Sequence, residues 1–272
     1  SINDIAERRR IRRKLTFWRI FSFLFIAAGI VLAWMALNGG SLEADANKDH
    51  IARITISGLI QDDKELLERI ERIARKDSAK ALIVSISSPG GTTYGGAVIY
   101  KAIRRVAEKK PVVSDVRTLA ASAGYMIAVG GDTIVAGDNS ITGSIGVIFQ
   151  YPQVKPLLDK LGVSLEEIKS APLKAEPSPF HDASQEAKDV MRLMVMDSFD
   201  WFVSLVAERR HLTKEQALKL ADGRVYTGRQ ALAAKLVDTI GGEAEIRKFL
   251  EGKKLAKDLP IVDWVPPSKT SP

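Results

Sequence analysis

Apolar residues follow two distinct patterns from position 51 onward. Short runs rich in β-branched residues alternate with stretches in which apolar side chains repeat every three or four positions. The first pattern predicts buried strands and the second predicts amphipathic helices. Strands are expected at 51–57, 79–87, 111–117, 133–136 and 146–149, and helices at 63–75, 95–108 and 185–210. Such alternation indicates an α/β fold with a mostly parallel sheet.

The last third of the chain is predicted to be mainly helical. Thr213 and Thr227 each have a glutamine three positions later, which is the spacing of a capping box at a helix start. Two further helices are therefore expected after the long amphipathic stretch. We place the globular domain at 51–250 and expect residues 251–272, which are rich in proline near their end, to form a C-terminal tail.

A third pattern precedes the domain. Residues 20–37 are 18 consecutive positions without a charge, and most of them are apolar. A helix of this length spans ~27 Å, close to the thickness of the hydrocarbon core of a bilayer. We therefore expect one transmembrane helix at 20–37, followed by a linker at 38–50. A cleaved signal peptide is the alternative, but the run is long for one and no small-residue cleavage site follows it.

The charge distribution gives this anchor an orientation. The chain carries a net charge of +7, and residues 1–19 hold seven basic and two acidic side chains, which is five of those seven charges. Basic residues beside an apolar run are a topology signal rather than a nucleic-acid footprint. Residues 1–19 are thus expected in the cytoplasm and the domain on the outer side, with the lipid bilayer rather than nucleic acid as partner.

The amino-acid composition limits which catalytic groups the chain can use. The chain has no cysteine and three histidines, which excludes a thiol nucleophile and a thiolate metal site. A serine at 122 stands out, because Ala-Ala-Ser-Ala-Gly-Tyr at 120–125 lies between a predicted strand and an apolar helix. The start of a helix favours developing negative charge. The N–H groups of Ala123 and of Gly91, in Ser-Pro-Gly-Gly at 88–91, would form an oxyanion hole.

Each of these motifs also has a plain structural interpretation. A serine before a helix is commonly a cap, and Pro-Gly-Gly after a strand is commonly only a turn. A catalytic serine needs a base within hydrogen-bond reach. Lysine serves as that base when burial keeps it neutral, and residue type alone does not choose between Lys169 and Lys174. His181 is the histidine alternative.

Several motifs occur together and in a fixed order. They are Ser-Ser-Pro-Gly-Gly at 87–91, Ala-Ala-Ser-Ala-Gly-Tyr at 120–125, Thr-Gly-Ser-Ile-Gly-Val at 142–147, the segment 169–174, Asp-Gly-Arg-Val-Tyr-Thr-Gly-Arg-Gln-Ala at 222–231 and Leu-Val-Asp at 236–238. This set resembles the S49 serine peptidases, in particular the short form of bacterial signal peptide peptidase A. The resemblance covers about residues 51–250 together with the anchor.

The resemblance implies a Clp protease/crotonase-like fold of ββα units. It implies Ser122 as nucleophile, Lys174 as general base and the N–H groups of Gly91 and Ala123 as oxyanion donors, although the family often has glycine where this chain has Ala123. An extended peptide substrate is expected along a strand edge near 142–148. The residues expected to bind it are Gly90, Gly143, Ser144 and Gly146.

The resemblance further implies a homo-oligomer in which the lysine acts on the serine of an adjacent protomer. It places the protein in the bacterial inner membrane, where it would degrade signal peptides left after secretion without a metal or cofactor. Three alternatives remain: a membrane scaffold without catalysis, a crotonase-type acyl-CoA enzyme, and a membrane protease that acts on whole membrane proteins.

Overall fold

The computed structural model describes residues 18–19, 21–31 and 48–266. The residues at 18–19 and 21–31 are helical, with exposed side chains. Within the described residues, no helix is both long enough and apolar enough to cross a membrane. The expected anchor at 20–37 extends beyond the described part at both ends. The basic segment before it and the linker after it lie almost wholly outside.

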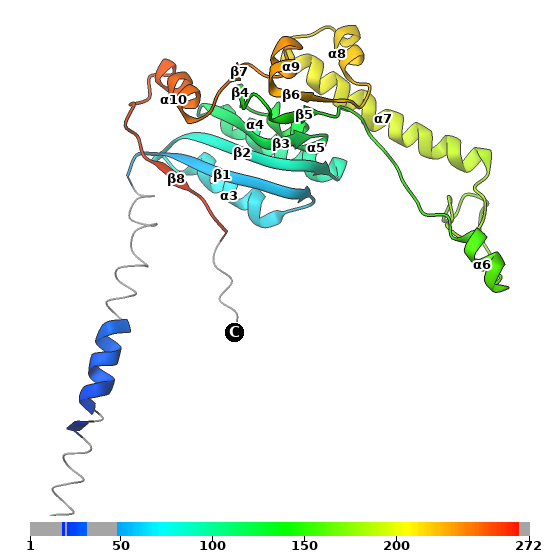
Figure 1. The fold of residues 1–272 in the computed structure, drawn as a ribbon, viewed down its shortest axis with the longest axis horizontal. Coiled ribbons are helices and arrows are strands. Elements are labelled where there is room, and N and C mark those ends of the chain that lie inside the picture. Colours follow the sequence, from blue (N-terminus) through cyan, green and yellow to red (C-terminus); the bar gives the residue numbers. More distant parts are fainter. Residues whose placement is uncertain (1–17, 20, 32–47, 267–272) are drawn as a thin grey trace, which may run out of the picture.

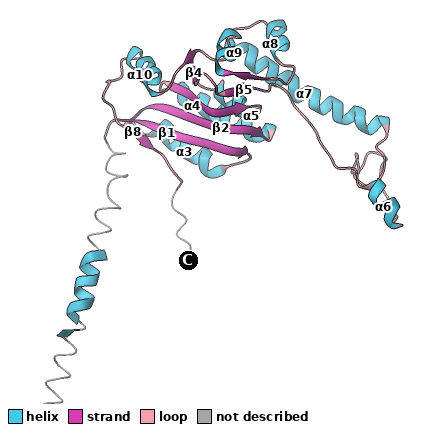
Figure 2. Ribbon diagram, in the orientation of Figure 1, coloured by secondary structure: helices cyan, strands magenta, loops and turns pink. Residues whose placement is uncertain are grey.

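One sheet of eight strands forms the body of the protein (Figures 1 and 2). The strands are β1 (His50–Ile60), β2 (Ala79–Gly91), β3 (Val112–Ala121), β4 (Thr133–Ala136), β5 (Ile141–Gly143), β6 (Val225–Thr227), β7 (Thr239–Ile240) and β8 (Ile261–Asp263). β1, β2 and β3 pair in parallel, and β4 and β5 pair with successive segments of the next edge of β3. The expected α/β fold with a mostly parallel sheet is confirmed, and β5 with β6 is an antiparallel pair.

Helices cover both faces of this sheet. They are α3 (Lys64–Arg75), α4 (Thr93–Ala107), α5 (Ala123–Ala128), α6 (Lys155–Leu161), α7 (Gln185–Arg210), α8 (Lys214–Leu220), α9 (Gly228–Ala233) and α10 (Glu243–Gly252). The larger apolar core lies between the sheet and α3, α4, α5 and the second half of α7. A smaller core lies under α10 on the opposite face.

The apolar run in β2 explains why this strand is central. Leu82, Val84 and Ile86 point into the larger core, whereas Ala81 and Ile83 point into the core under α10. A strand that is apolar on both faces must be covered on both sides, as the continuous run in the sequence predicts. β2 therefore lies between β1 and β3, and its last residues, 88–91, are held by pairing with these two strands.

The predicted helix starts are confirmed. Asp63 caps α3 by accepting a hydrogen bond from the N–H of Leu66 at 2.9 Å. Thr213 and Thr227 each form the expected capping box with the glutamine three residues later. α7 has the bounds that its periodicity predicts. Local sequence signals were sufficient at these positions because caps and helical periodicity depend on neighbouring residues only.

Three expectations need correction at the ends and edges of the sheet. Residues 146–149 form no strand: positive φ angles at Gly143 (88°) and Ser144 (50°) turn the chain away from β5. His50, expected in the linker, is buried at the start of β1, where its ring accepts a hydrogen bond from the indole N–H of Trp264 at 3.2 Å. The expected tail at 251–272 contributes β8, which pairs in parallel with β1.

A long arm projects from this body. Residues 144–196, which we call the arm, run out to α6 and return along the first half of α7 (Figure 1). The second half of α7 packs into the larger core through Phe202, Val203 and Val206. The arm instead exposes many apolar side chains: Ile148, Phe149, Leu157, Leu161, Val163, Leu165, Ile168, Leu173, Phe180, Val190, Leu193, Met194 and Met196. An exposed apolar surface of this extent marks a contact with another molecule.

Gly91 is expected to be essential for the pairing of β1 with β2. A Cβ atom at this position would overlap the backbone carbonyl of Ile60 on β1. We expect Gly91→Ala to lower the free energy of unfolding by at least about 2 kcal/mol, measured by urea unfolding of the full-length protein. Gly252→Ala is the matched control, because no atom lies within 4 Å of its added methyl. Equal stability of the two variants would contradict this interpretation.

Candidate active site

Ser122 lies at the turn between β3 and α5. Its φ of 54° and ψ of −120° form a combination that residues other than glycine rarely adopt. The N–H of Ser122 donates to the carbonyl of Gly143 at 2.9 Å, and its carbonyl accepts from the N–H of Met126 at 2.9 Å. The strained turn is therefore held between β5 and α5, which is how such backbone conformations persist.

The hydroxyl of Ser122 does not serve as a helix cap. Although Ser122 is the N-cap residue of α5, its side chain makes no capping hydrogen bond within the described structure. The first N–H groups of the helix have no partner inside the helix itself. The geometry thus favours a half-buried serine free for chemistry over a capping serine. A sharp strand-to-helix turn exposes the nucleophile of α/β-hydrolases in the same way.

The glycine loop expected after the strand forms the end of β2 (residues 88–91) and lies directly against this turn. Gly90 has a φ of 118°, and a Cβ atom on it would lie 2.9 Å from the Cβ of Ser122 and 3.3 Å from the nitrogen of Ala123. Buried Ser88 fixes the loop: its hydroxyl donates to the carbonyl of Gly58 at 2.6 Å and accepts from the N–H of Gly90 at 3.1 Å. The two motifs are therefore brought together, with Gly90 adjacent to Ser122.

The motif at 142–147 borders the site on another side. Gly143 contacts Ser122 through the hydrogen bond described above, and the N–H of Ser144 donates to the carbonyl of Arg224 at 2.8 Å. Gly146 lies beside Gly223, because a Cβ on Gly146 would be 3.7 Å from its Cα. Both edges of β5 are occupied, one by β3 and one by β6. The expected open edge near 142–148 is thus limited to the residues after Gly143.

Residues of the motif at 236–238 contact α5 and β4, next to the site. Tyr125, in α5, is fully buried, and its hydroxyl donates to the carbonyl of Leu236 at 2.8 Å. Burial raises the pKa of Tyr125 well above its usual range, so it remains a neutral donor. Asp238 accepts from the N–H of Ile134 in β4 at 2.7 Å and pairs with Arg210. These contacts fix α5 against the end of the sheet.

Lys174 is not near this centre within one chain. It lies in the segment between α6 and α7, which Figure 1 shows at the outer end of the arm, away from α5, the helix that begins after Ser122. Its side chain is exposed, and among the described residues it has no carboxylate partner. The structure of one chain therefore separates the two residues expected to form the dyad.

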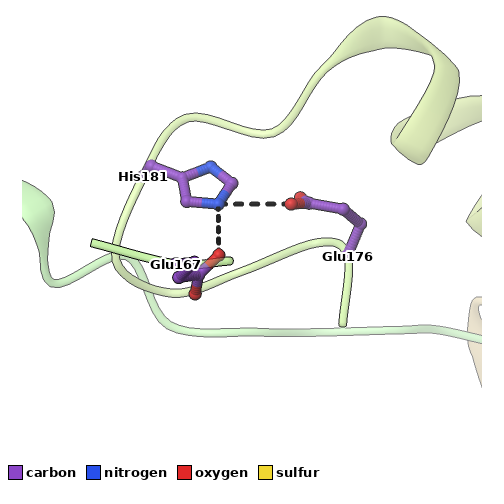
Figure 3. A group of neighbouring side chains, drawn as sticks. All are labelled: Glu167, Glu176 and His181. Atoms are coloured by element: carbon purple, nitrogen blue, oxygen red, sulfur yellow. Dashed lines mark ion pairs between the residues drawn. The ribbon is translucent and has the colours of Figure 1, made fainter. Parts of the chain in front are cut away.

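Lys169 and His181, the two alternatives to Lys174 as general base, contact the same two glutamates. The ammonium of Lys169 lies 2.7 Å from Glu167 and 2.5 Å from Glu176. The Nε2 atom of His181 lies 3.2 Å from Glu176 and 3.4 Å from Glu167, and Figure 3 shows these three side chains converging. Hydrogen bonds to Glu167 and Glu176 raise the pKa of Lys169 and keep it charged. Neither Lys169 nor His181 lies near Ser122, so both fit a structural role in the arm.

The same three side chains are also the ones that most resemble a metal site. Within the described residues, Glu167, Glu176 and His181 bring donor atoms within 4.8 Å of one another. The ammonium of Lys169, however, already bonds to both carboxylates. The cation of this cluster is therefore a lysine of the chain itself, and no metal is assigned here.

Two residues of the site were missed by sequence reasoning. Ser88 was expected only as part of a turn motif, although a polar residue within a buried strand signals a required hydrogen bond. Glu176 was not singled out, although an acidic residue seven positions after Lys169 and two after Lys174 is a candidate partner for either. Spatial neighbours decide between such candidates, and spacing does not.

Two protein-family models and several known proteases are similar to this chain. The model of peptidase family S49 matches residues 104–257, and the model of the Clp proteases matches residues 49–139. "Putative protease slr0021" of Synechocystis sp. is 38% identical over 206 residues, which is 75% of this chain and 74% of that protein. "Putative signal peptide peptidase SppA" of Enterococcus faecium is 33% identical over 238 residues, 82% of this chain and 69% of the other.

A larger relative and two solved structures extend the comparison. "Protease 4" of Haemophilus influenzae is 33% identical over 70% of this chain, which corresponds to 32% of that protein. The membrane-bound stomatin-specific protease 1510-N is 20% identical, with TM-scores of 0.54 and 0.55 in two mutant forms, one of them in complex with a substrate peptide. These structures cover 81% and 82% of this chain, and 99% and 94% of their own. The fold is thus a Clp protease-like α/β fold with a mixed sheet.

The strain at Ser122 gives a measurable consequence. Glycine adopts a positive φ without penalty, whereas alanine keeps the strain of the native serine. We expect Ser122→Gly to exceed Ser122→Ala in free energy of unfolding by about 1 kcal/mol. Urea unfolding of the two variants would test this, and equal stabilities would show that the turn is not strained.

Proposed function

Because the chain belongs to peptidase family S49, we propose that it is a membrane-bound serine endopeptidase with Ser122 as nucleophile and Lys174 as general base. Its proposed substrates are apolar peptides such as cleaved signal peptides. The observation that carries the proposal is the turn at Ser122: a strained, half-buried serine with an uncommitted hydroxyl, next to a glycine loop. An acyl-CoA enzyme of the crotonase type would not require this serine.

The glycine loop supports the assignment of the oxyanion donors. The N–H of Gly90 is occupied by Ser88, which leaves Gly91 as the next donor along the loop. The N–H of Thr92 points to Ile60 on β1 at 2.9 Å, and successive N–H groups of a strand point to opposite edges. The N–H of Gly91 is thus directed toward the side of Ser122. Ala123, at the first position of α5, supplies the second donor.

The position of Lys174 supports a site shared between protomers. The segment between α6 and α7, which carries Lys174, lies at the outer end of the arm and away from α5 in Figure 1, so Lys174 would need a large rearrangement to reach Ser122 of the same chain. Many apolar side chains of the arm are exposed, and contact with a second copy of the chain would bury them. In such an oligomer the arm of one protomer would bring Lys174 to Ser122 of its neighbour. The contact would also remove Lys174 from water, which favours the neutral amine.

The mechanism follows from these roles. Neutral Lys174 accepts the proton of the Ser122 hydroxyl as the oxygen attacks the peptide carbonyl. The oxyanion is stabilised by the N–H groups of Gly91 and Ala123. The ammonium of Lys174 then protonates the leaving amine, and the C–N bond breaks. A water molecule deprotonated by the same lysine hydrolyses the ester on Ser122 and releases a carboxylate.

The location and substrate class belong to the same proposal. Residues 20–37 would anchor the chain in the inner membrane of a bacterium, with the basic segment in the cytoplasm and the peptidase domain outside. The chain after Gly143 turns away from the sheet, and Ile148 and Phe149 further along it are exposed. Because both edges of β5 are occupied, the residues after Gly143, including Ser144 and Gly146, would offer backbone groups to an extended substrate, a mode that tolerates varied apolar sequences.

The dyad is tested by removing each member. We expect Ser122→Ala and Lys174→Ala each to lower kcat/KM for an apolar fluorogenic peptide by at least about 1,000-fold, measured with the full-length protein in detergent. A lysine base is active in its neutral form, so the activity of the wild-type protein should rise with pH. Activity that persists in Lys174→Ala and disappears in His181→Ala would assign the base to histidine.

Sharing of the site is tested by mixing the inactive variants. In hetero-oligomers of Ser122→Ala and Lys174→Ala chains, some interfaces combine an intact serine with an intact lysine. Random mixing in equal amounts should restore roughly a quarter of the wild-type activity. Mixed oligomers that form but remain inactive would show that both residues act from one chain.

A further inference from the structure

The charged cluster in the arm encloses the loop that carries Lys174. Lys169 and Glu176 stand immediately before and after residues 170–175, and the distance between their charged atoms is 2.5 Å. This contact closes the six-residue loop at its base. Inside the loop, the N–H of Lys174 donates to the carbonyl of Ala171 at 3.1 Å. The loop is thus a closed turn rather than an open chain.

The ion pair between Lys169 and Glu176 is largely buried, although the arm that carries it is exposed. The side chain of Glu176 is only 7% exposed and that of Lys169 is 19% exposed. The second carboxylate oxygen of Glu176 accepts from the N–H of Ser178 at 3.3 Å, and Gln153 donates to the carbonyl of Ser178 at 3.2 Å. A partly buried ion pair with further hydrogen bonds is screened less by solvent than an exposed pair.

We propose that Lys169 is a positioning residue for the general base, which rests on the proposed function of Lys174. Lys169 closes the 170–175 loop and occupies the carboxylates of Glu167 and Glu176, so that neither is free to pair with Lys174. Both functions come from one ammonium group, and both would be lost together if it were removed.

Lys169 also keeps a carboxylate near the proposed base in the sequence from pairing with that base. Glu176 is two residues from Lys174 along the chain. A free carboxylate within about 4–6 Å of an amine favours the charged form of that amine, which is the inactive form of a base. Two groups face the glutamates: the ammonium of Lys169, and the ring of His181, which Figure 3 shows beside both carboxylates. Lys169 is the nearer of the two groups: its ammonium lies 2.5 and 2.7 Å from the carboxylates, whereas Nε2 of His181 lies 3.2 and 3.4 Å from them.

The experiment is a pH profile of kcat/KM for an apolar fluorogenic peptide, with the full-length protein in detergent. Lys169→Met removes the ammonium and frees both carboxylates. We expect the rising limb of its profile to move upward by about one pH unit relative to the wild-type protein. Lys169→Arg keeps a cation between the glutamates and should restore the wild-type midpoint. Adding Glu176→Gln to Lys169→Met should reverse at least half of the shift, because one freed carboxylate is gone.

The matched control is Lys160→Met, which removes an exposed lysine of α6 from the same arm. Its profile should coincide with that of the wild-type protein. A Lys169→Met profile that is lower at every pH but not displaced would mean that Lys169 only stabilises the arm, and would overturn the proposal. A displacement of equal size in Lys160→Met would overturn it as well, because the effect would then follow net charge alone.

Failure of this inference is distinguishable from failure of the proposed function. If Ser122→Ala or Lys174→Ala retains activity, the proposed dyad is wrong. If both are inactive while Lys169→Met keeps the wild-type midpoint, the dyad stands and only the role of Lys169 is rejected. Should Lys169→Met fail to assemble, Glu176→Gln/Glu167→Gln in the Lys169→Met background removes the unpaired charges. Recovery of the wild-type midpoint there is expected, and a displaced midpoint would contradict the proposal.

Discussion

The hydrogen bond from the N–H of Ser122 to the carbonyl of Gly143 joins the turn that carries Ser122 to the end of β5, and the site depends on this connection. β3 pairs with β2 on one edge and with β4 and β5 on the other, and its last residues, 119–121, pair with β5. Its end is therefore rigid, and the chain has to turn sharply there to enter α5. The strain of that turn is supported by the sheet, and in return the serine hydroxyl is left out of the hydrogen bonds of the fold.

Around this point the body of the protein is rigid and the arm is exposed. Ser88 fixes the glycine loop, and Tyr125 fixes α5 against residues 236–238. The arm contains a loop closed by an ion cluster, and among the described residues it carries many exposed apolar side chains. A rigid turn with the proposed nucleophile and a lysine on a projecting arm are together the arrangement expected of a site completed by a neighbour.

Much of the body could be predicted from the sequence. The apolar run of β2, the periodicity of α7 and the capping boxes at Thr213 and Thr227 depend on local physics, and each was found where it was expected. The false strand at 146–149 arose because its apolar residues fit a strand, while the change of direction depends on backbone angles at Gly143 and Ser144. β8 was missed because three residues beside a proline give little signal.

The candidate site was predictable only in part, for a physical reason. Ser122 and the glycine loop lie on adjacent ends of consecutive strands, so the topology of the sheet brings them together. The choice between Lys169 and Lys174 depends on which carboxylates surround each ammonium in space, and spacing along the chain does not reveal this. In the proposed oligomer, whether Lys174 meets Ser122 depends on contacts between chains, which the pattern of apolar and polar positions in one chain does not reveal.

The most direct test of this account is the distance between the Nζ atom of Lys174 and the Oγ atom of Ser122 in an experimental structure of the assembled full-length protein. The account predicts about 3 Å between atoms of two neighbouring protomers, with the amine shielded from water. An assembly in which every Lys174 remains in bulk solvent, beyond hydrogen-bond reach of every Ser122, would contradict it.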